Sequence, residues 1–289
     1  MNWGQVPQFL ISGFTSGSIY ALAALGFNLI YNATSIINFA QGEFIMLGGM
    51  FMFTFYGLLG LPLILSFAIT VALVACIAAL IERVAIHPVR RAPVLNLIVI
   101  TIGISIILSG AAMLVWGKDA LFYPPFSGTS SIHILGGAIG SQALWVLGIT
   151  ILLAVLLWGF LDRAIVGKAI RACAENKDAA RTLGIDVEKM ILISFIISGA
   201  LGAMGGIIIT PITLIEFNSG TLLGLKGFCA LIVGGIGSNR GALMGGFLLG
   251  ISESLAIGFI SSSLKDAIAF LIMLLVLFVR PKGILGSSR

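Results

Sequence analysis

Long runs of apolar residues, separated by short polar breaks, fill almost the whole chain. Nine such runs lie near residues 7–31, 36–57, 62–84, 94–116, 143–161, 190–212, 222–237, 241–259 and 264–280. A bilayer core about 30 Å thick is crossed by about 20 helical residues, so these lengths predict membrane-spanning helices. The 222–237 run is short and rich in glycine, and a re-entrant element is the alternative there. The pattern predicts an all-α, polytopic transmembrane helical bundle with eight or nine crossings.

One polar segment interrupts this pattern. Residues 162–189 hold 6 basic and 5 acidic side chains, whereas residues 1–81 contain a single charge, Glu43. We therefore expect one transmembrane domain in two parts, 1–161 and 190–289, joined by a water-facing loop at 162–189.

Basic side chains predict the orientation of the chain, because Lys and Arg collect in cytoplasmic loops. The 82–91 loop, the 162–189 segment and the 280–282 tail are all basic. Five crossings before 162–189 place all three in the cytoplasm, together with the C-terminus. The N-terminus and the long 117–142 loop are then expected outside.

Composition supports the membrane assignment and excludes several functions. Hydrophobic residues make up 59% of the 289 positions and charged residues 9%, whereas a soluble domain carries about 25% charged residues. The net charge of +5 is explained by basic loops, so no nucleic-acid partner is expected. Three widely separated cysteines indicate no disulfide framework.

Signatures of enzymes, metal sites and nucleotide sites are missing from the sequence. The two histidines, His87 and His133, are expected on opposite sides of the membrane, which argues against a metal site or a catalytic Ser-His pair. The glycine-rich run at 234–241 lacks the lysine of a phosphate-binding loop and is better explained as a tight turn between helices. We expect no catalytic residue, no metal and no cofactor on this chain.

Polar residues within the apolar runs are candidates for a transport pathway, since a charge inside a membrane is costly unless paired or hydrated. The candidates are Asn38, Gln41, Glu43, Lys226 and Glu253. The alternative is structural: Glu43 and Lys226 pair with each other or hold helix ends in place.

Two features predict how the helices pack. Glycines four residues apart, such as Gly13 with Gly17 and Gly246 with Gly250, allow close contact within the chain or with a second subunit. In addition, residues 38–49 loosely parallel residues 224–235, and each segment follows a helix rich in small residues. Those two helices are predicted to cross in opposite directions, as in an inverted repeat with broken helices; chance similarity is the alternative.

The polar segment itself contains helix-forming residues between 171 and 185. Asn176 or Asp178 is suited to cap a short helix, and Gly184 is suited to the left-handed residue after its last turn. The small side chains of Ala174, Ala179 and Ala180 allow another surface to approach. A docking element for a soluble partner and an ordinary solvated loop both remain open from these residues.

The motifs resemble those of the permease subunit of branched-chain amino acid ABC importers, the LivH-like family. They are GSIYAL at 17–22, ALG at 24–26, NFAQGE at 38–43, ERVA at 82–85, the 171–185 stretch, GGIGS at 234–238 and RPKGILG at 280–286. The resemblance implies an importer permease in the cell membrane, driven by two cytoplasmic ATP-binding subunits that carry ATP and Mg²⁺.

The same resemblance implies a second homologous permease subunit and an extracytoplasmic solute-binding protein as further partners. It also implies that the 171–185 stretch contacts an ATP-binding subunit, through Arg171, Glu175, Asn176, Asp178, Ala179, Ala180, Arg181, Leu183 and Gly184. Branched-chain or related hydrophobic amino acids are the expected substrates. Other amino acids, amides or urea, or a stand-alone proton-coupled transporter, are the alternatives.

Overall fold

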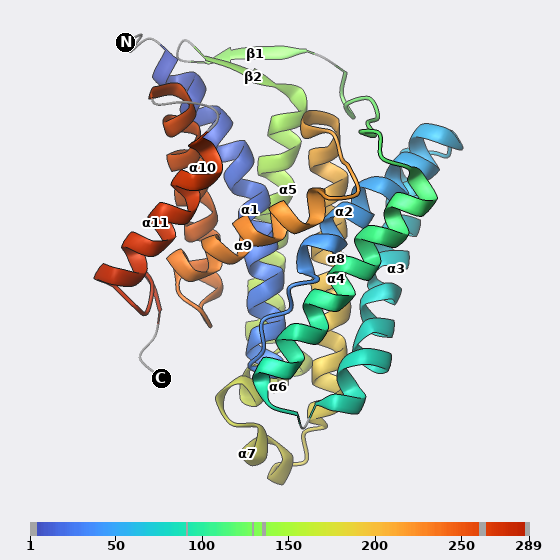
Figure 1. Cartoon of the computed structure of the whole chain (residues 1–289), viewed down its shortest axis with the longest axis vertical. Helices are drawn as coiled ribbons and strands as arrows, with labels where there is room; N and C mark the ends of the chain where they lie inside the picture. The colour runs from blue at the N-terminus through green and yellow to red at the C-terminus, as the bar shows by residue number, and fades with distance from the viewer. Residues whose placement is uncertain (1–4, 91, 129, 135–136, 260–263, 287–289) are drawn as a thin grey trace.

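The computed structural model describes residues 5–90, 92–128, 130–134, 137–259 and 264–286. These ranges are mainly helical (Figure 1). The first part contains α1 (Val6–Thr34), α2 (Gln41–Met52) with its continuation η2 (Phe53–Leu58), α3 (Leu63–Ile81) with η3 (Glu82–Ile86) and η4 (His87–Val89), α4 (Val94–Trp116) and α5 (Ser141–Arg163). The second contains α6 (Ile165–Glu175), α7 (Lys177–Thr182), α8 (Val187–Thr213), α9 (Ser219–Gly234), α10 (Asn239–Phe259) and α11 (Lys265–Val279).

The prediction of an all-α polytopic bundle is confirmed. Within the described residues, six helices are long and apolar enough to cross a membrane: α1, α3 with its continuation to Val89, α4, α5, α8 and α10. The other three predicted runs correspond to α2 with η2, α9 and α11, which are shorter. A small antiparallel hairpin, β1 (Ser131–Ile134) with β2 (Gly137–Gly140), precedes α5.

Proline positions set several helix boundaries. Pro62 and Pro93 are the residues immediately before α3 and α4, and Pro211 lies in the last turn of α8. A proline ring costs least at a helix end, because its missing N–H has no carbonyl partner to lose at the start of a helix. The predicted starts of α3 and α4 follow from that rule.

The 36–57 run is broken at its start, which corrects its predicted boundary. Helix α1 ends with Ser35 in the left-handed conformation (φ 63°), and α2 begins only at Gln41. The non-helical residues between them return from the end of α1, so α2 starts partway up the bundle (Figure 1).

Helices α1 and α10 touch backbone to backbone through glycines. A methyl group added to Gly13 would lie 2.7 Å from the Cα atom of Ile251, and one added to Gly17 would lie 2.9 Å from the Gly246 carbonyl oxygen. The four-residue glycine spacing therefore serves packing within the chain, where close van der Waals contact holds helices together in lipid.

The two short helices α2 and α9 cross at another glycine contact. A methyl group on Gly42 would collide with the carbonyl oxygen of Gly220 and would lie 2.7 Å from the Cα atom of Gly224. Helices α1 and α8, which precede these short helices, run in opposite directions (Figure 1). This is the relative direction that the sequence parallel predicts.

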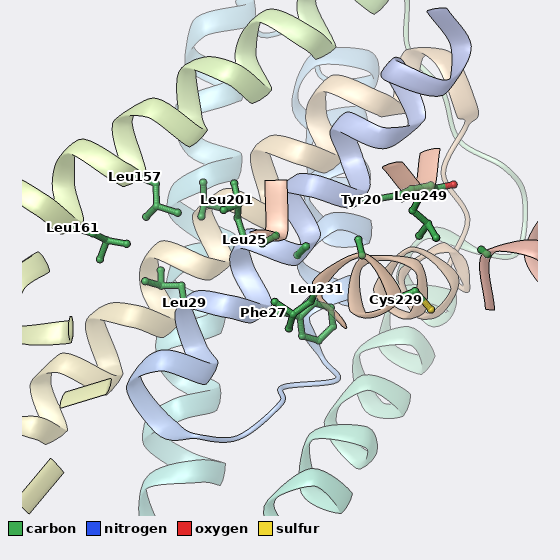
Figure 2. Packing of buried hydrophobic residues seen from close by; sticks show 14 of the residues in the cluster. Tyr20, Leu25, Phe27, Leu29, Leu157, Leu161, Leu201, Cys229, Leu231 and Leu249 are labelled. Carbon is green, nitrogen blue, oxygen red and sulfur yellow. The ribbon is translucent and has the colours of Figure 1, made fainter. Parts of the chain in front are cut away.

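The main core surrounds the middle of α1 (Figure 2). Its labelled members come from α1, α5, α8, α9 and α10: Tyr20, Leu25, Phe27, Leu29, Leu157, Leu161, Leu201, Cys229, Leu231 and Leu249. The outer helices instead expose large apolar side chains, such as Ile64 of α3 (83%) and Leu114 of α4 (84%). A buried centre within an apolar exterior is the pattern of a multi-pass membrane protein.

Candidate functional site

The polar segment 162–189 forms an elbow of two short helices, α6 and α7, at one end of the bundle (Figure 1). Asn176 separates them in an extended conformation, and its side-chain oxygen accepts hydrogen bonds from the backbone N–H groups of Asp178 (2.9 Å) and Ala179 (3.0 Å). Gly184 follows α7 with φ +81°. Asn176 is therefore the helix cap, and Gly184 adopts the left-handed conformation expected from the sequence.

One face of the elbow is attached to the bundle. Cys173, Ala180 and Val187 form a small buried cluster, and the ammonium of Lys177 donates a hydrogen bond to the carbonyl oxygen of Thr34, at the end of α1. Burial lowers the pKa of Lys177 below its ordinary value and raises the pKa of the Cys173 thiol. The prediction that Ala180 presents a small side chain to another surface is wrong, because Ala180 is buried under its own chain.

The opposite face of the elbow is open. Leu183 is 79% exposed, and Ala179 and Glu175 are exposed as well. Arg181 pairs with Asp178 (3.2 Å) along α7. Arg171 pairs with Asp162, at the end of α5 (2.5 Å). Of the predicted docking residues, Ala180 alone is buried, and the others are exposed.

The basic 82–91 loop lies at the same end of the bundle. Arg90 contacts Glu188, in the first turn of α8, at 2.5 Å, and His87 lies 3.3 Å from the same carboxylate. Arg91 lies outside the described residues. The loop is thus connected by charge to the helix that follows the elbow.

A buried carboxylate lies where α2, α4 and α9 meet. Glu43, in the first turn of α2, accepts hydrogen bonds from the hydroxyls of Ser105 (2.8 Å) and Thr221 (3.2 Å), both to Oε1. Its Oε2 atom has no hydrogen-bond partner among the described residues, and Glu43 is 0% exposed. A buried oxygen without a partner is costly and marks a position where a proton or another donor would be accepted.

Gln41 and Asn38 precede this carboxylate in the chain and are buried like it. The Ser198 hydroxyl donates to Gln41 Oε1 (2.5 Å), and Gln41 Nε2 donates to the Ser198 carbonyl oxygen (3.2 Å), so α2 is bonded to α8. Asn38 Oδ1 accepts from the Ala40 N–H (3.2 Å), whereas its Nδ2 is buried with no hydrogen-bond partner in the described part of the chain. The broken start of α2 thus gathers three of the five pathway candidates.

The other two candidates lie in a separate buried network. Lys226 of α9 contacts Glu253 of α10 (2.6 Å) and Asp266 of α11 (2.7 Å). The Tyr20 hydroxyl donates to the second Glu253 oxygen (2.8 Å), and the Lys226 ammonium lies 5.4 Å from the Tyr20 ring centre. The suggested pairing of Glu43 with Lys226 is wrong, because Lys226 is bound by carboxylates of its own half of the chain.

Sequence reasoning overlooked several contributors to these sites. Three of them are the charged or phenolic side chains of Lys177, Tyr20 and Asp266, which make the hydrogen bonds and ion pair described above. Two more are the hydroxyls of Ser105 and Ser198, which come from apolar helices. For Tyr20 and the serines the available signal was polarity within an apolar run. Nothing in the sequence indicated which distant helix each would meet.

Within the described residues, no group of three His, Cys, Asp or Glu side chains could hold a metal ion.

Comparison with known proteins places this architecture in a family. The sequence model described as "Branched-chain amino acid transport system / permease component" matches residues 9–277. The chain is 35% identical to the high-affinity branched-chain amino acid transport system permease protein BraD of Pseudomonas aeruginosa, over 96% of this chain and 95% of that protein. It is 34% identical to the permease protein LivH of Escherichia coli K12, with the same coverage.

Structural similarity agrees with this relationship at the level of fold. PsaBC from Streptococcus pneumoniae, solved in complex with Fab, superposes with a TM-score of 0.50 over 96% of this chain and 92% of that chain, at 14% identity. Together, the match to the family over nearly the whole chain and the helical bundle show that this chain belongs to the family of branched-chain amino acid transport system permease components.

Proposed function

We propose that this chain is the membrane-spanning subunit of an ABC importer for branched-chain or related hydrophobic amino acids. The observation that carries the proposal is its similarity, along 96% of its length, to permeases named for that transport. ATP hydrolysis is assigned to two separate cytoplasmic ATP-binding subunits. A second homologous permease and an extracytoplasmic solute-binding protein complete the assembly. This chain itself performs no chemistry.

The α6–α7 elbow is the proposed contact with an ATP-binding subunit. Its open face carries Leu183 and Arg181, while its other face is joined to the bundle. The bond from Lys177 to the Thr34 carbonyl connects the elbow directly to the end of α1. Because Thr34 immediately precedes the break between α1 and α2, movement of the elbow would reach the start of α2 through a short path.

The orientation of the chain in the membrane is inferred from the basic segments at the end of the molecule that carries the elbow. The 82–91 loop is bonded to the start of α8, beside the elbow, and the basic tail is bonded to the end of α9 through Ile284 and Val233 (2.9 Å). Basic segments collect in the cytoplasm. We therefore place this end inside and the N-terminus outside.

The proposed pathway includes the broken start of α2, with Asn38, Gln41 and Glu43. Support comes from the unpaired Glu43 Oε2 and Asn38 Nδ2 atoms, one an acceptor and the other a donor. A zwitterionic substrate requires both kinds of group. Lys226 and Glu253 are assigned a structural role, because each is paired within its own network.

Transport in vesicles tests the function. The assembled complex is reconstituted with ATP, and uptake of radiolabelled leucine, isoleucine or valine is compared with uptake of urea and amides. Uptake should require ATP and the ATP-binding subunits, and should favour the branched-chain amino acids. Uptake that needs neither would instead identify a stand-alone transporter, and a preference for urea or amides would correct the substrate.

Two variants test the assigned roles. Leu183→Asp should release the ATP-binding subunits during purification, because a charge replaces an exposed apolar contact. Lys189→Asp, a charge change at the same end but in the first turn of α8 rather than in α6 or α7, should retain them. Retention by both variants would contradict the docking assignment. Glu43→Gln should reduce transport without loss of the folded complex if the carboxylate faces the substrate.

A further inference from the structure

Two adjoining hollows open on the side of the bundle between α5 and α10. One, of about 300 Å³, is polar and is lined by residues that include Asp162, Arg171 and Ser238. The other, of about 200 Å³, is apolar. Both are lined by Trp158, Asn239 and Arg240, so the polar hollow continues directly into the apolar one.

Positive charge predominates in the polar hollow. Arg171 is paired with Asp162 (2.5 Å). Arg240 has no carboxylate within ion-pair distance among the described residues; its guanidinium lies over the Trp158 ring, 4.8 Å from the ring centre. Two guanidinium groups thus face one carboxylate. An anion entering this hollow would meet one positive charge that no carboxylate of the described residues neutralises.

The floor of the polar hollow is held in place by a buried side chain. Asn28 of α1 is 0% exposed, its Oδ1 accepts from the Gly237 N–H (2.8 Å), and its Nδ2 donates to Asn239 Oδ1 (2.5 Å). The turn from α9 into α10 is therefore fixed to α1. The position of Arg240, the residue after Asn239, is set by this bonded turn.

The apolar hollow is a groove between two membrane-spanning helices. Leu25 of α1 forms its floor, with Val155 of α5 and Leu243 of α10 on its sides. In Figure 1, α1 lies between α5 and α10. Val155 is 55% exposed on the outside of the bundle. The groove therefore opens toward the hydrocarbon region rather than toward the interior of the protein.

The two hollows lie near the ends of membrane-spanning helices, the level at which lipid headgroups meet hydrocarbon. Trp158 lies in the last two turns of α5, and Arg240 lies in the first turn of α10, at the end of the bundle that carries the basic loop and the elbow. Tryptophan and arginine are favoured at this depth, and basic pockets between membrane helices bind anionic headgroups.

We propose that this surface is a binding site for one anionic phospholipid. Arg240, supported by Arg171, receives the phosphate, and an acyl chain lies along the groove over Leu25. An anion without an acyl chain would use only the polar hollow, and an apolar partner would leave the charge of Arg240 unused. A phospholipid uses both. The assignment does not depend on which substrate the chain transports.

Native mass spectrometry of the purified full-length chain tests the site, with phosphatidylglycerol and phosphatidylcholine of identical acyl chains. Phosphatidylglycerol should bind about fivefold more tightly, the ratio that one basic side chain near a membrane surface provides. Arg240→Gln should reduce that preference to less than about twofold. Arg83→Gln, which removes the same charge elsewhere at this end, should retain it. Equal binding of the two lipids, or an unchanged preference in Arg240→Gln, would overturn the proposal.

The groove is tested separately from the headgroup contact. Ala154→Phe places a ring in the groove and should weaken phosphatidylglycerol binding, whereas Leu152→Phe, on an exposed part of α5 outside the groove, should not. Glycerol phosphate should fail to displace the lipid; displacement by it would reassign the site to a free anion. Measurement on the assembled transporter completes the test, because loss of lipid on assembly would assign the groove to a protein subunit.

Discussion

The buried network around Lys226 provides the sharpest test of how this bundle is held together. Lys226→Met keeps a side chain of similar length but removes the cation that lies 2.6 Å from Glu253 and 2.7 Å from Asp266. The Glu253 side chain is 7% exposed and keeps only the Tyr20 hydroxyl as a partner. Removal of one member of a buried ion pair costs about 3–5 kcal/mol, because the remaining charge stays buried without compensation.

The size of the stability loss in each variant separates the effect of burial from that of charge attraction alone. The Asp266 side chain is 43% exposed, so its contribution is reduced by solvent and Asp266→Asn should have the smaller effect. Replacement of both charges avoids the stranded carboxylate. The double variant Lys226→Met with Glu253→Gln should therefore recover at least about 2 kcal/mol relative to Lys226→Met alone.

Equilibrium unfolding in detergent, followed by circular dichroism, measures these differences. Lys189→Met is the matched control, because Lys189 is 74% exposed in a surface pair with Asp186 and should change stability by less than about 1 kcal/mol. The reasoning fails if Lys226→Met costs no more than this control, or if the double variant is less stable than Lys226→Met alone.

Three further substitutions test other parts of the structure. Gly42→Ala should destabilise the fold by about 1–3 kcal/mol, because the added methyl group meets the Gly220 carbonyl. Gly103→Ala, with open space around it, should be neutral or slightly stabilising in the same unfolding assay, and equal losses in the two variants would contradict the Gly42 contact. Asn176→Ala should lower the hydrogen-exchange protection of α7 by about 1 kcal/mol, whereas Asn176→Asp should preserve it. Unchanged protection in the alanine variant would contradict the assignment of Asn176 as the helix cap. Glu43→Leu should lower the free energy of unfolding by about 1–3 kcal/mol, because the Ser105 hydroxyl loses its acceptor. Glu43→Gln keeps an acceptor and should remain within about 1 kcal/mol of the native chain. A larger loss of stability in the glutamine variant would indicate that the ionised carboxylate itself stabilises the fold.

Local features of the chain were readable from sequence, because they depend on neighbouring residues. Apolar length marked the membrane helices, and Pro62, Pro93 and Pro211 lie at or near helix ends. Asn176 caps α7, and Gly184 takes a positive φ after it. Each of these outcomes follows from the geometry and hydrogen bonding of a few consecutive residues.

Tertiary structure decided which distant residues meet. The sequence could name Glu43, Lys226 and Glu253 as costly charges inside a membrane, but not that Lys226 pairs with Glu253 and Asp266 while Glu43 bonds to the hydroxyls of Ser105 and Thr221. Ala180 likewise became buried through its position beside Cys173 and Val187. Helix rotation and crossing determine such pairings, and these arise from the packing of the whole bundle, with glycine contacts such as Gly42 on Gly220.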